Sequence, residues 1–338
     1  MEQILFTNWR APDDIVCMSA CIRDLVASYP EQYEIHVAGS NPSLWENNPY
    51  ISKVWGPRPP CGIPNFRLNC VEQLVESGRV RLHYITAFHR NLQSRLGIEL
   101  PVLHPKGDLH LSNEERAHSL VEGRYWLVVA GWKADMPARI WSVAKFQHLV
   151  SLLRNEGINC VQGGALLTGH RHPHLTDVES FVGKTDLRGF LRLVYHADGV
   201  ICPVTFAMHA AAAFDKPCVV IAGGRESWWW EAYLNSPLRH FGEECASVLV
   251  PHRFLHSIGE LDCCRITGCW KTHVVPHELV PEASLCELPV DDSHGQTIPR
   301  CLDGIRVSDV MAAVTDYINA GETTTEDKWL TTTAGSLV

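Results

Sequence analysis

Residues 194–226 constrain the fold of this chain more than any other stretch of it. Residues 199–202 form an apolar run typical of a buried strand, and residues 208–214 form a small-residue helix preceded by Thr205 as its N-cap. The β-branched run 219–221 predicts a second buried strand, which ends in a Gly-Gly turn. This order places the start of a helix at the carboxyl end of a parallel strand. Unpaired N–H groups and the positive end of the helix dipole at such a place suit a diphosphate.

The turn and helix of this stretch also resemble a known motif. Thr205, Met208 and His209 are similar to the nucleotide-diphosphate motif of the ADP-heptose glycosyltransferases, glycosyltransferase family 9. That motif usually reads Asp-Thr-Gly-x-Met/Ser-His, whereas this chain has Val204 and Phe206 at the Asp and Gly positions. The loop has therefore lost a carboxylate and some backbone freedom. An ordinary strand–helix–strand crossover with a buried histidine is the alternative interpretation.

The resemblance implies a GT-B fold, in which two Rossmann-like domains face each other across a cleft. It implies transfer of heptose from an ADP-sugar to a hydroxyl of a protein or glycan. No divalent metal is expected in catalysis, because helix N–H groups and cations can hold the leaving diphosphate. The predicted donor-binding residues are Lys133, Arg139, Thr205, Phe206, Met208, His209, Gly223, Gly224, Arg225 and Glu226.

Residues 125–146 resemble the first strand and loop of the family's second domain. There a basic residue shortly before a Trp reaches the donor phosphates, and Arg139 stands at that place before Trp141. Arginine keeps the charge of the more usual lysine and adds a bidentate grip on phosphate. Lys133 is a second candidate, and solvated loop cations are the alternative for both residues.

Residues 4–25 resemble the opening of the same family, with a short strand, a turn, Asp-Ile-Val and a helix. Asp14 falls where the family places its catalytic base, although Arg10 and Asp13 replace glycines of the usual turn. A carboxylate at a strand-to-helix turn can face an interdomain cleft and accept a proton from an attacking hydroxyl. The alternative is that Asp14 only caps the helix.

Five of the 13 cysteines crowd between positions 263 and 301. No leader sequence is apparent near Met1, which favours a metal site over disulfides, and four thiolates can form a cage for zinc or iron. The spacing also resembles the C-terminal four-cysteine iron site of the autotransporter heptosyltransferases of this family. The predicted ligands of this structural metal are Cys264, Cys269, Cys286 and Cys301, with Cys263 as the alternative to Cys264. Five independent, reduced, buried thiols are the competing interpretation.

Composition limits the class of protein. A chain of 338 residues with 46% hydrophobic and 20% charged residues is expected to form about two domains with sizeable cores. The net charge of −9 disfavours a nucleic-acid partner. No apolar run reaches about 18 residues, so we predict a cytoplasmic protein without a membrane span. The expected partners are an ADP-sugar, a protein or glycan acceptor and further copies of the chain. The alternatives are transfer to modified DNA or a small metabolite, and a catalytically silent sugar-nucleotide-binding assembly protein.

The chain is expected to divide into five parts. They are an N-terminal Rossmann-like acceptor domain (1–122), a Rossmann-like nucleotide-sugar domain (123–260), a cysteine-rich metal segment (261–303), a C-terminal helix (304–320) and a flexible tail (321–338). The predicted strands of the first domain are 4–7, 34–38, 53–55 and 81–84. Three successive indoles at 228–230 cannot all face one core, so at least one is expected to be exposed or to pack on a ligand or another chain.

Two helices complete the sequence-based expectations. Thr185 is expected to cap a helix over residues 186–195, which carries its apolar residues on one face. An amphipathic helix over residues 307–320 is expected to pack back across the two domains.

Overall fold

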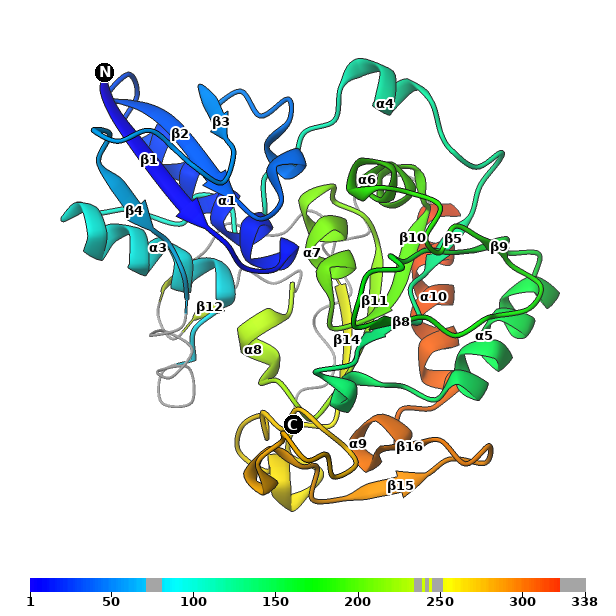
Figure 1. The fold of residues 1–338 in the computed structure, drawn as a ribbon. Helices are drawn as coiled ribbons and strands as arrows, with labels where there is room; N and C mark the ends of the chain where they lie inside the picture. Colours follow the sequence, from blue (N-terminus) through cyan, green and yellow to red (C-terminus); the bar gives the residue numbers. More distant parts are fainter. Residues whose placement is uncertain (71–80, 234–238, 241–242, 245–251, 323–338) are drawn as a thin grey trace.

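A computed structural model of the chain describes residues 1–70, 81–233, 239–240, 243–244 and 252–322. It contains two parallel β-sheets, each with helices packed on it, and a loop-rich C-terminal segment that lies against the second sheet (Figure 1). The predicted tail falls almost entirely on residues 323–338, which lie outside the described part of the chain. Within the described residues, no helix is long and apolar enough to cross a membrane.

The first sheet has the strand order β3-β2-β1-β4, and all neighbouring strands run parallel. The strands are β1 (Glu2–Asn8), β2 (Tyr33–Gly39), β3 (Lys53–Trp55) and β4 (Asn65–Arg67). The helices α1 (Pro12–Ser28) and α3 (Tyr84–Leu96) pack together beside it. The strand order reverses at β1, which has β2 on one side and β4 on the other, so the carboxyl end of β1 is the expected place for a ligand.

Three of the four strands predicted for this region are confirmed, and the strand at 81–84 is wrong. The chain enters helix α3 there, because the His83 side chain caps the helix and accepts a hydrogen bond from the backbone N–H of Ile85 at 3.2 Å. The fourth strand of the sheet is β4, which the sequence analysis missed. Its three residues are too short to give an alternating pattern.

The second sheet has the order β14-β11-β10-β5-β7-β9, again with parallel neighbours. The strands are β5 (Trp126–Val128), β7 (Cys160–Gln162), β9 (Glu179–Ser180), β10 (Gly199–Pro203), β11 (Cys218–Gly223) and β14 (His252–His256). Counted along the chain, this is the doubly wound order 3-2-1-4-5-6 of dinucleotide-binding sheets read from the other edge. The order reverses between β5 and β10. The strand–helix–strand unit predicted around Thr205 is therefore confirmed and lies at the reversal point.

The helices of the second sheet are α5 (Val143–Asn155), α6 (Leu187–His196), α7 (Phe206–Ala213) and α10 (Val307–Glu322). Helix α10 packs on α5, β11 and β14, so it covers the second sheet only and does not cross to the first. The N-cap of α6 is Asp186, which accepts a hydrogen bond from Gly189 N at 2.7 Å, rather than the predicted Thr185. A carboxylate and a hydroxyl are both good caps, and the helix begins one residue later than expected.

Short elements connect the larger ones and form the C-terminal segment. They are η1 (Pro42–Trp45), α4 (Asn113–Ala117), β6 (Trp132–Lys133), η2 (Pro137–Arg139), β8 (His170–Arg171), α8 (Trp228–Glu231), β12 (Arg239–His240), β13 (Glu243–Glu244), η3 (Asp262–Cys264), η4 (Glu282–Ser284), β15 (Pro289–Asp291), β16 (Thr297–Pro299) and α9 (Arg300–Asp303). One hydrophobic core joins the facing sides of both sheets through α1 and α7, and a second lies under α5 and α10.

Candidate functional site

The two helices that follow the reversal points pack against each other. Helix α1 begins after β1 and helix α7 begins after β10, and the two are in contact between the sheets (Figure 1). Their contact includes the thiol of Cys17 on α1, which lies 3.6 Å from Nδ1 of His209 on α7. This contact brings the first turn of α1, with Asp14, near the first turn of α7, with Thr205 as its cap.

Asp14 is a buried carboxyl group with an unusual environment. It is 6% exposed, and its Oδ1 has no hydrogen-bond partner among the described residues. Burial, with the neighbouring charge of Asp13, raises the pKa of Asp14 to about 7. A hydrogen bond from Tyr84 and the charges of Arg10 and His209 act in the opposite direction without offsetting the burial. A carboxyl group that titrates near neutral pH can accept a proton from a bound hydroxyl.

Helix α7 presents its N-terminus at the carboxyl end of β10. The Thr205 hydroxyl caps it and accepts a hydrogen bond from Ala207 N at 3.3 Å. Phe206 packs on Phe190 with 5.8 Å between ring centroids, and Met208 is fully buried in the core. These contacts fix the helix start, where free backbone N–H groups can meet an anion.

His209 lies at the interface between the helices and has partners on both sides. Its Nδ1 is 2.7 Å from the Tyr233 hydroxyl, and its Nε2 is 3.7 Å from a Glu231 carboxylate oxygen. Burial acts to raise the pKa of Glu231, but the hydrogen bond with His209 and the charge of Arg139 outweigh it and hold that pKa below its usual value. Glu231 is therefore an ionised group inside the interface.

Arg139 and Arg225 share one carboxylate. Arg139 donates from Nε to Glu226 Oε1 at 2.8 Å and from Nη1 to the carbonyl of Val204 at 3.0 Å. Arg225 forms an ion pair with the same oxygen of Glu226. The Arg139 side chain is 21% exposed, whereas Arg225 is buried and Glu226 is completely inaccessible. Arg139 is thus the member of this charged cluster that solvent, or a phosphate, can reach.

The remaining predicted donor residues lie on other loops near the charged cluster. Gly223 and Gly224 pack against the C-terminal segment, since an added Cβ would lie 2.8 Å from Leu302 and 2.7 Å from the Cys264 thiol, respectively. Lys133 lies on β6, which pairs antiparallel with β8, and lines a cavity of about 390 Å³ together with Asp135 and His170. The structure therefore brings Thr205, His209 and Arg139 to the reversal point of the sheet. The two glycines lie where the turn after β11 packs on the C-terminal segment.

Four cysteines of the C-terminal segment line one small cavity of about 10 Å³, namely Cys263, Cys269, Cys286 and Cys301. Cys264 is not among the residues that line this cavity, and its thiol donates to the carbonyl of Ser257 at 3.4 Å. Burial and the neighbouring thiols raise the pKa of Cys301 to about 12. As the side chains are placed, no group of three or more His, Cys, Asp and Glu residues in the described part of the chain converges closely enough to hold a metal ion.

The three indoles of α8 have different surroundings. Trp229 and Trp230 are buried, and Trp228 is partly exposed and stacks on His256 with 6.3 Å between ring centroids. Trp230 packs between Tyr84 of α3, at 5.1 Å, and Trp270 of the cysteine-rich segment, at 6.3 Å. It therefore joins three parts of the molecule.

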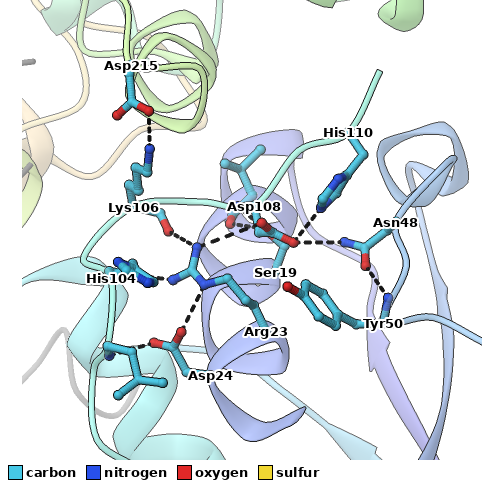
Figure 2. A network of polar contacts seen from close by, with 12 residues as sticks. Ser19, Arg23, Asp24, Asn48, Tyr50, His104, Lys106, Asp108, His110 and Asp215 are labelled. Atoms are coloured by element: carbon cyan, nitrogen blue, oxygen red, sulfur yellow. Dashed lines mark hydrogen bonds and ion pairs between the residues drawn. The ribbon is translucent and has the colours of Figure 1, made fainter. Parts of the chain in front are cut away.

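A polar network joins α1 to the segment that connects the two sheets (Figure 2). Arg23 of α1 donates to the carbonyls of His104 and Lys106 at 2.6 and 3.1 Å. Lys106 forms an ion pair with Asp215, which follows α7. Asp108, in the same connecting segment, accepts a hydrogen bond from Asn48 at 3.2 Å. The connection between the two sheets thus fixes α1 relative to α7, the two helices that carry Asp14 and His209.

Sequence reasoning missed Tyr84, Glu231 and Tyr233. Tyr84 lowers the pKa of Asp14, and the other two residues flank His209. No short motif contains them together with the residues they contact, because they come from α3, α8 and the coil after α8. The one available signal was a glutamate directly after an apolar tryptophan run, which is costly to bury unless it has a partner.

Comparison with solved structures gives the fold class. A glycosyltransferase family 9 protein from Veillonella parvula is 12% identical, with 94% of this chain and 97% of that chain covered and a TM-score of 0.62. The E. coli ADP-heptose LPS heptosyltransferase II is 15% identical, with 95% and 100% covered and a TM-score of 0.58. The dodecameric iron-containing heptosyltransferase TibC from enterotoxigenic E. coli, solved with ADP-D-β-D-heptose, is 14% identical, with 94% and 76% covered and a TM-score of 0.62. At such identities the likeness establishes a GT-B-like fold.

A family model matches part of the sequence. Residues 77–237 match the model of glycosyltransferase family 9 (heptosyltransferase). No curated protein matches the chain. The chain is a glycosyltransferase, and residues 77–237 are similar to family 9, in agreement with the resemblance given by the sequence motifs.

Proposed function

We propose that this glycosyltransferase transfers heptose from ADP-heptose to a hydroxyl group of a protein or glycan. The observation that carries the proposal is Asp14, a buried carboxyl group with a free oxygen and a pKa near 7, on a helix packed against the start of α7. The donor identity is supported by the heptosyltransferase family match and by relatives described with ADP-heptose. The net charge of −9 favours such an acceptor over modified DNA.

In the proposed reaction Asp14 accepts the proton of the acceptor hydroxyl. The hydroxyl oxygen then forms a bond to the anomeric carbon of the heptose, while the bond from that carbon to the diphosphate breaks and ADP leaves with the electron pair. The backbone N–H groups at the start of α7 and the guanidinium of Arg139 stabilise the negative charge that develops on the diphosphate. Lys133 supplies a second cation at the edge of the site.

The other predicted donor residues are assigned supporting roles in this proposal. Thr205 fixes the first turn of α7, and Phe206 and Met208 hold that turn on the core. His209 links α7 to α1 through Cys17. Gly223 and Gly224 let the turn after β11 pack on the C-terminal segment. Glu226 of that turn pairs with both Arg139 and Arg225.

A donor screen tests the function directly. Differential scanning of the full chain with ADP-heptose, ADP-glucose, UDP-glucose and ADP is expected to show the largest rise in melting temperature with ADP-heptose, because selective binding to the folded state stabilises it. Mass spectrometry of a bacterial protein and glycan extract incubated with ADP-heptose would then detect the product. Stabilisation by a UDP-sugar instead of an ADP-sugar would contradict the proposal.

The pH dependence of transfer is expected to report the environment of Asp14. Because the base must be ionised, kcat/KM should fall as the pH drops below about 7. Asp13→Asn removes a like charge and should move this fall to lower pH, whereas Arg10→Gln removes an opposite charge and should move it to higher pH. Rate profiles of the two variants measured between about pH 5 and 9 check the prediction; shifts in the same direction would contradict it.

Thr205→Ala should weaken ADP binding, because the variant loses the cap that orders the N-terminus of α7. His209→Ala should weaken it too, through the loss of the contacts with Tyr233 and Cys17. Asp186→Ala is the matched control, since it removes the cap of α6 and should leave the affinity unchanged. Titration calorimetry with ADP measures all three, and unchanged affinity in both test variants would mean that the motif is structural only.

We also propose one structural iron or zinc ion held by cysteine thiolates. The candidate ligands are Cys263, Cys269, Cys286 and Cys301, which line one cavity and whose side chains would have to turn inward to reach a common ion; thiolates are preferred ligands of both metals. Cys263 takes the place given to Cys264 in the sequence analysis, since the Cys264 thiol is directed at Ser257. TibC is described as iron-containing and dodecameric, which supports iron and a homo-oligomer for this chain. A complete set of four thiolates leaves no open position for substrate, so the role is structural.

A further inference from the structure

One stretch of the cysteine-rich segment, residues 268–272, lies alongside residues 224–227 and makes a ladder of hydrogen bonds with them. The bonds run from Cys269 N to Gly224 O at 3.1 Å, from Trp270 N to Arg225 O at 2.9 Å, and from Gly268 N to Ser227 Oγ at 2.9 Å. The ladder includes the turn after β11 that carries Arg225 and Glu226.

The same stretch also contacts the guanidinium group of Arg225 and the backbone of the short helix that carries Arg139. The carbonyl of Lys271 accepts a hydrogen bond from Nε of Arg225 at 2.6 Å. The carbonyl of Thr272 accepts one from Ala138 N at 3.0 Å, in the 3-10 helix η2 that ends with Arg139. Residues 268–272 therefore contact both of the loops that position the cations around Glu226.

Gly268 is the point of closest approach between the two backbones. A Cβ at this position would lie 2.3 Å from the carbonyl oxygen of Arg225, and 2.6 Å from backbone atoms of both Glu226 and Ser227. Such distances do not occur in folded proteins, and the obstructing atoms are backbone atoms that cannot rotate away. Glycine is needed here for space, because any side chain would push the two stretches apart.

The charged cluster needs contacts beyond its own ion pairs to keep its arrangement. Arg139 and Arg225 carry like charges and share the buried carboxylate of Glu226, so their mutual repulsion must be offset by further contacts. Lys271 and Val204 supply carbonyl oxygens for this, one to each guanidinium. A shift of residues 268–272 would remove one of these contacts and move η2 with it.

We propose that residues 268–272 are a backbone support for the nucleoside-diphosphate site, and that Gly268 is its positioning residue. The inference rests on the proposed donor role of Arg139. The support makes the cysteine-rich segment a determinant of donor affinity, because its contact with the turn after β11 holds the exposed guanidinium in place. It touches neither Asp14 nor its proposed acceptor.

The experiment compares ADP binding by Gly268→Ala and wild-type full-length protein. The added methyl group must displace the turn, so ADP affinity by calorimetry should fall by about tenfold or more, as for other small displacements of a binding group. Metal content and melting temperature are measured on the same samples, so that loss of the ion or of the fold is seen separately. Ile266→Ala, at an 80% exposed position on the same loop, is the matched control and should bind ADP normally.

Ser227→Ala gives a milder test that does not add volume. It removes the 2.9 Å hydrogen bond to Gly268 N and should reduce ADP affinity by a smaller factor in a protein that keeps its fold. Folded Gly268→Ala and Ser227→Ala proteins with wild-type ADP affinity would overturn the proposal. Failure of wild-type protein to bind ADP would instead contradict the proposed function, so the two failures are distinguishable.

Discussion

Asp14→Asn is expected to abolish transfer while leaving ADP binding intact. The amide cannot accept the acceptor proton, and positioned general bases contribute about 10²- to 10⁴-fold to rate. The donor groups belong to the second sheet, so the affinity for ADP should not change. Single-turnover kinetics with ADP-heptose, together with calorimetry for ADP, measure the two quantities on the same sample. An Asp14→Asn enzyme with near-normal turnover would remove Asp14 from the mechanism.

The stability of the same variant supplies a control against misfolding. The pKa of Asp14 rises from 3.8 to about 7 on folding, so the stability that the protonated carboxyl contributes is lost as the pH rises through about 7. Asparagine cannot ionise and avoids this loss. The variant should therefore unfold at a temperature equal to or above that of wild type at about pH 8. A large drop in melting temperature would mean that lost activity reflects lost structure.

Cys269→Ser is expected to release the metal and to destabilise the protein. Purified wild-type protein should contain about one iron or zinc per chain, because four thiolates hold one ion. Binding of a structural metal contributes directly to folding, so the variant should melt at a lower temperature, with residues 261–303 losing order first. Elemental analysis and thermal unfolding measure both effects. Loss of donor affinity should accompany them, because residues 268–272 support the donor site.

The adjacent cysteines give a matched pair for this prediction. Cys263→Ser should lose the metal, since Cys263 lines the cavity, and Cys264→Ser should keep it, since that thiol donates to Ser257. The opposite result would restore the ligand set expected from sequence. Protein without metal, in which all five thiols react freely after gentle unfolding, would show that the cysteines are independent buried residues.

The parts of the fold that sequence predicted are those set by local chemistry. Strands β1, β2, β3 and β10 follow from short apolar runs, and Thr205 was recognised as a cap because a cap depends only on the residues next to it. The position of Asp14 at a strand-to-helix turn can also be predicted from the residues next to it.

The environment of those residues was decided only by the tertiary structure. Tyr84, which was expected in a strand, begins a helix and lowers the pKa of Asp14, about 70 residues away in the sequence. Which of two adjacent cysteines faces the cavity depends on the direction of a single turn. Arg225 and Glu226 looked like exposed ligand contacts, yet they are buried under residues 268–272. Sequence determines which groups can form helices, strands and caps, because these are local equilibria. Burial, pKa and pairing depend on contacts between distant segments, and only the packed chain specifies those.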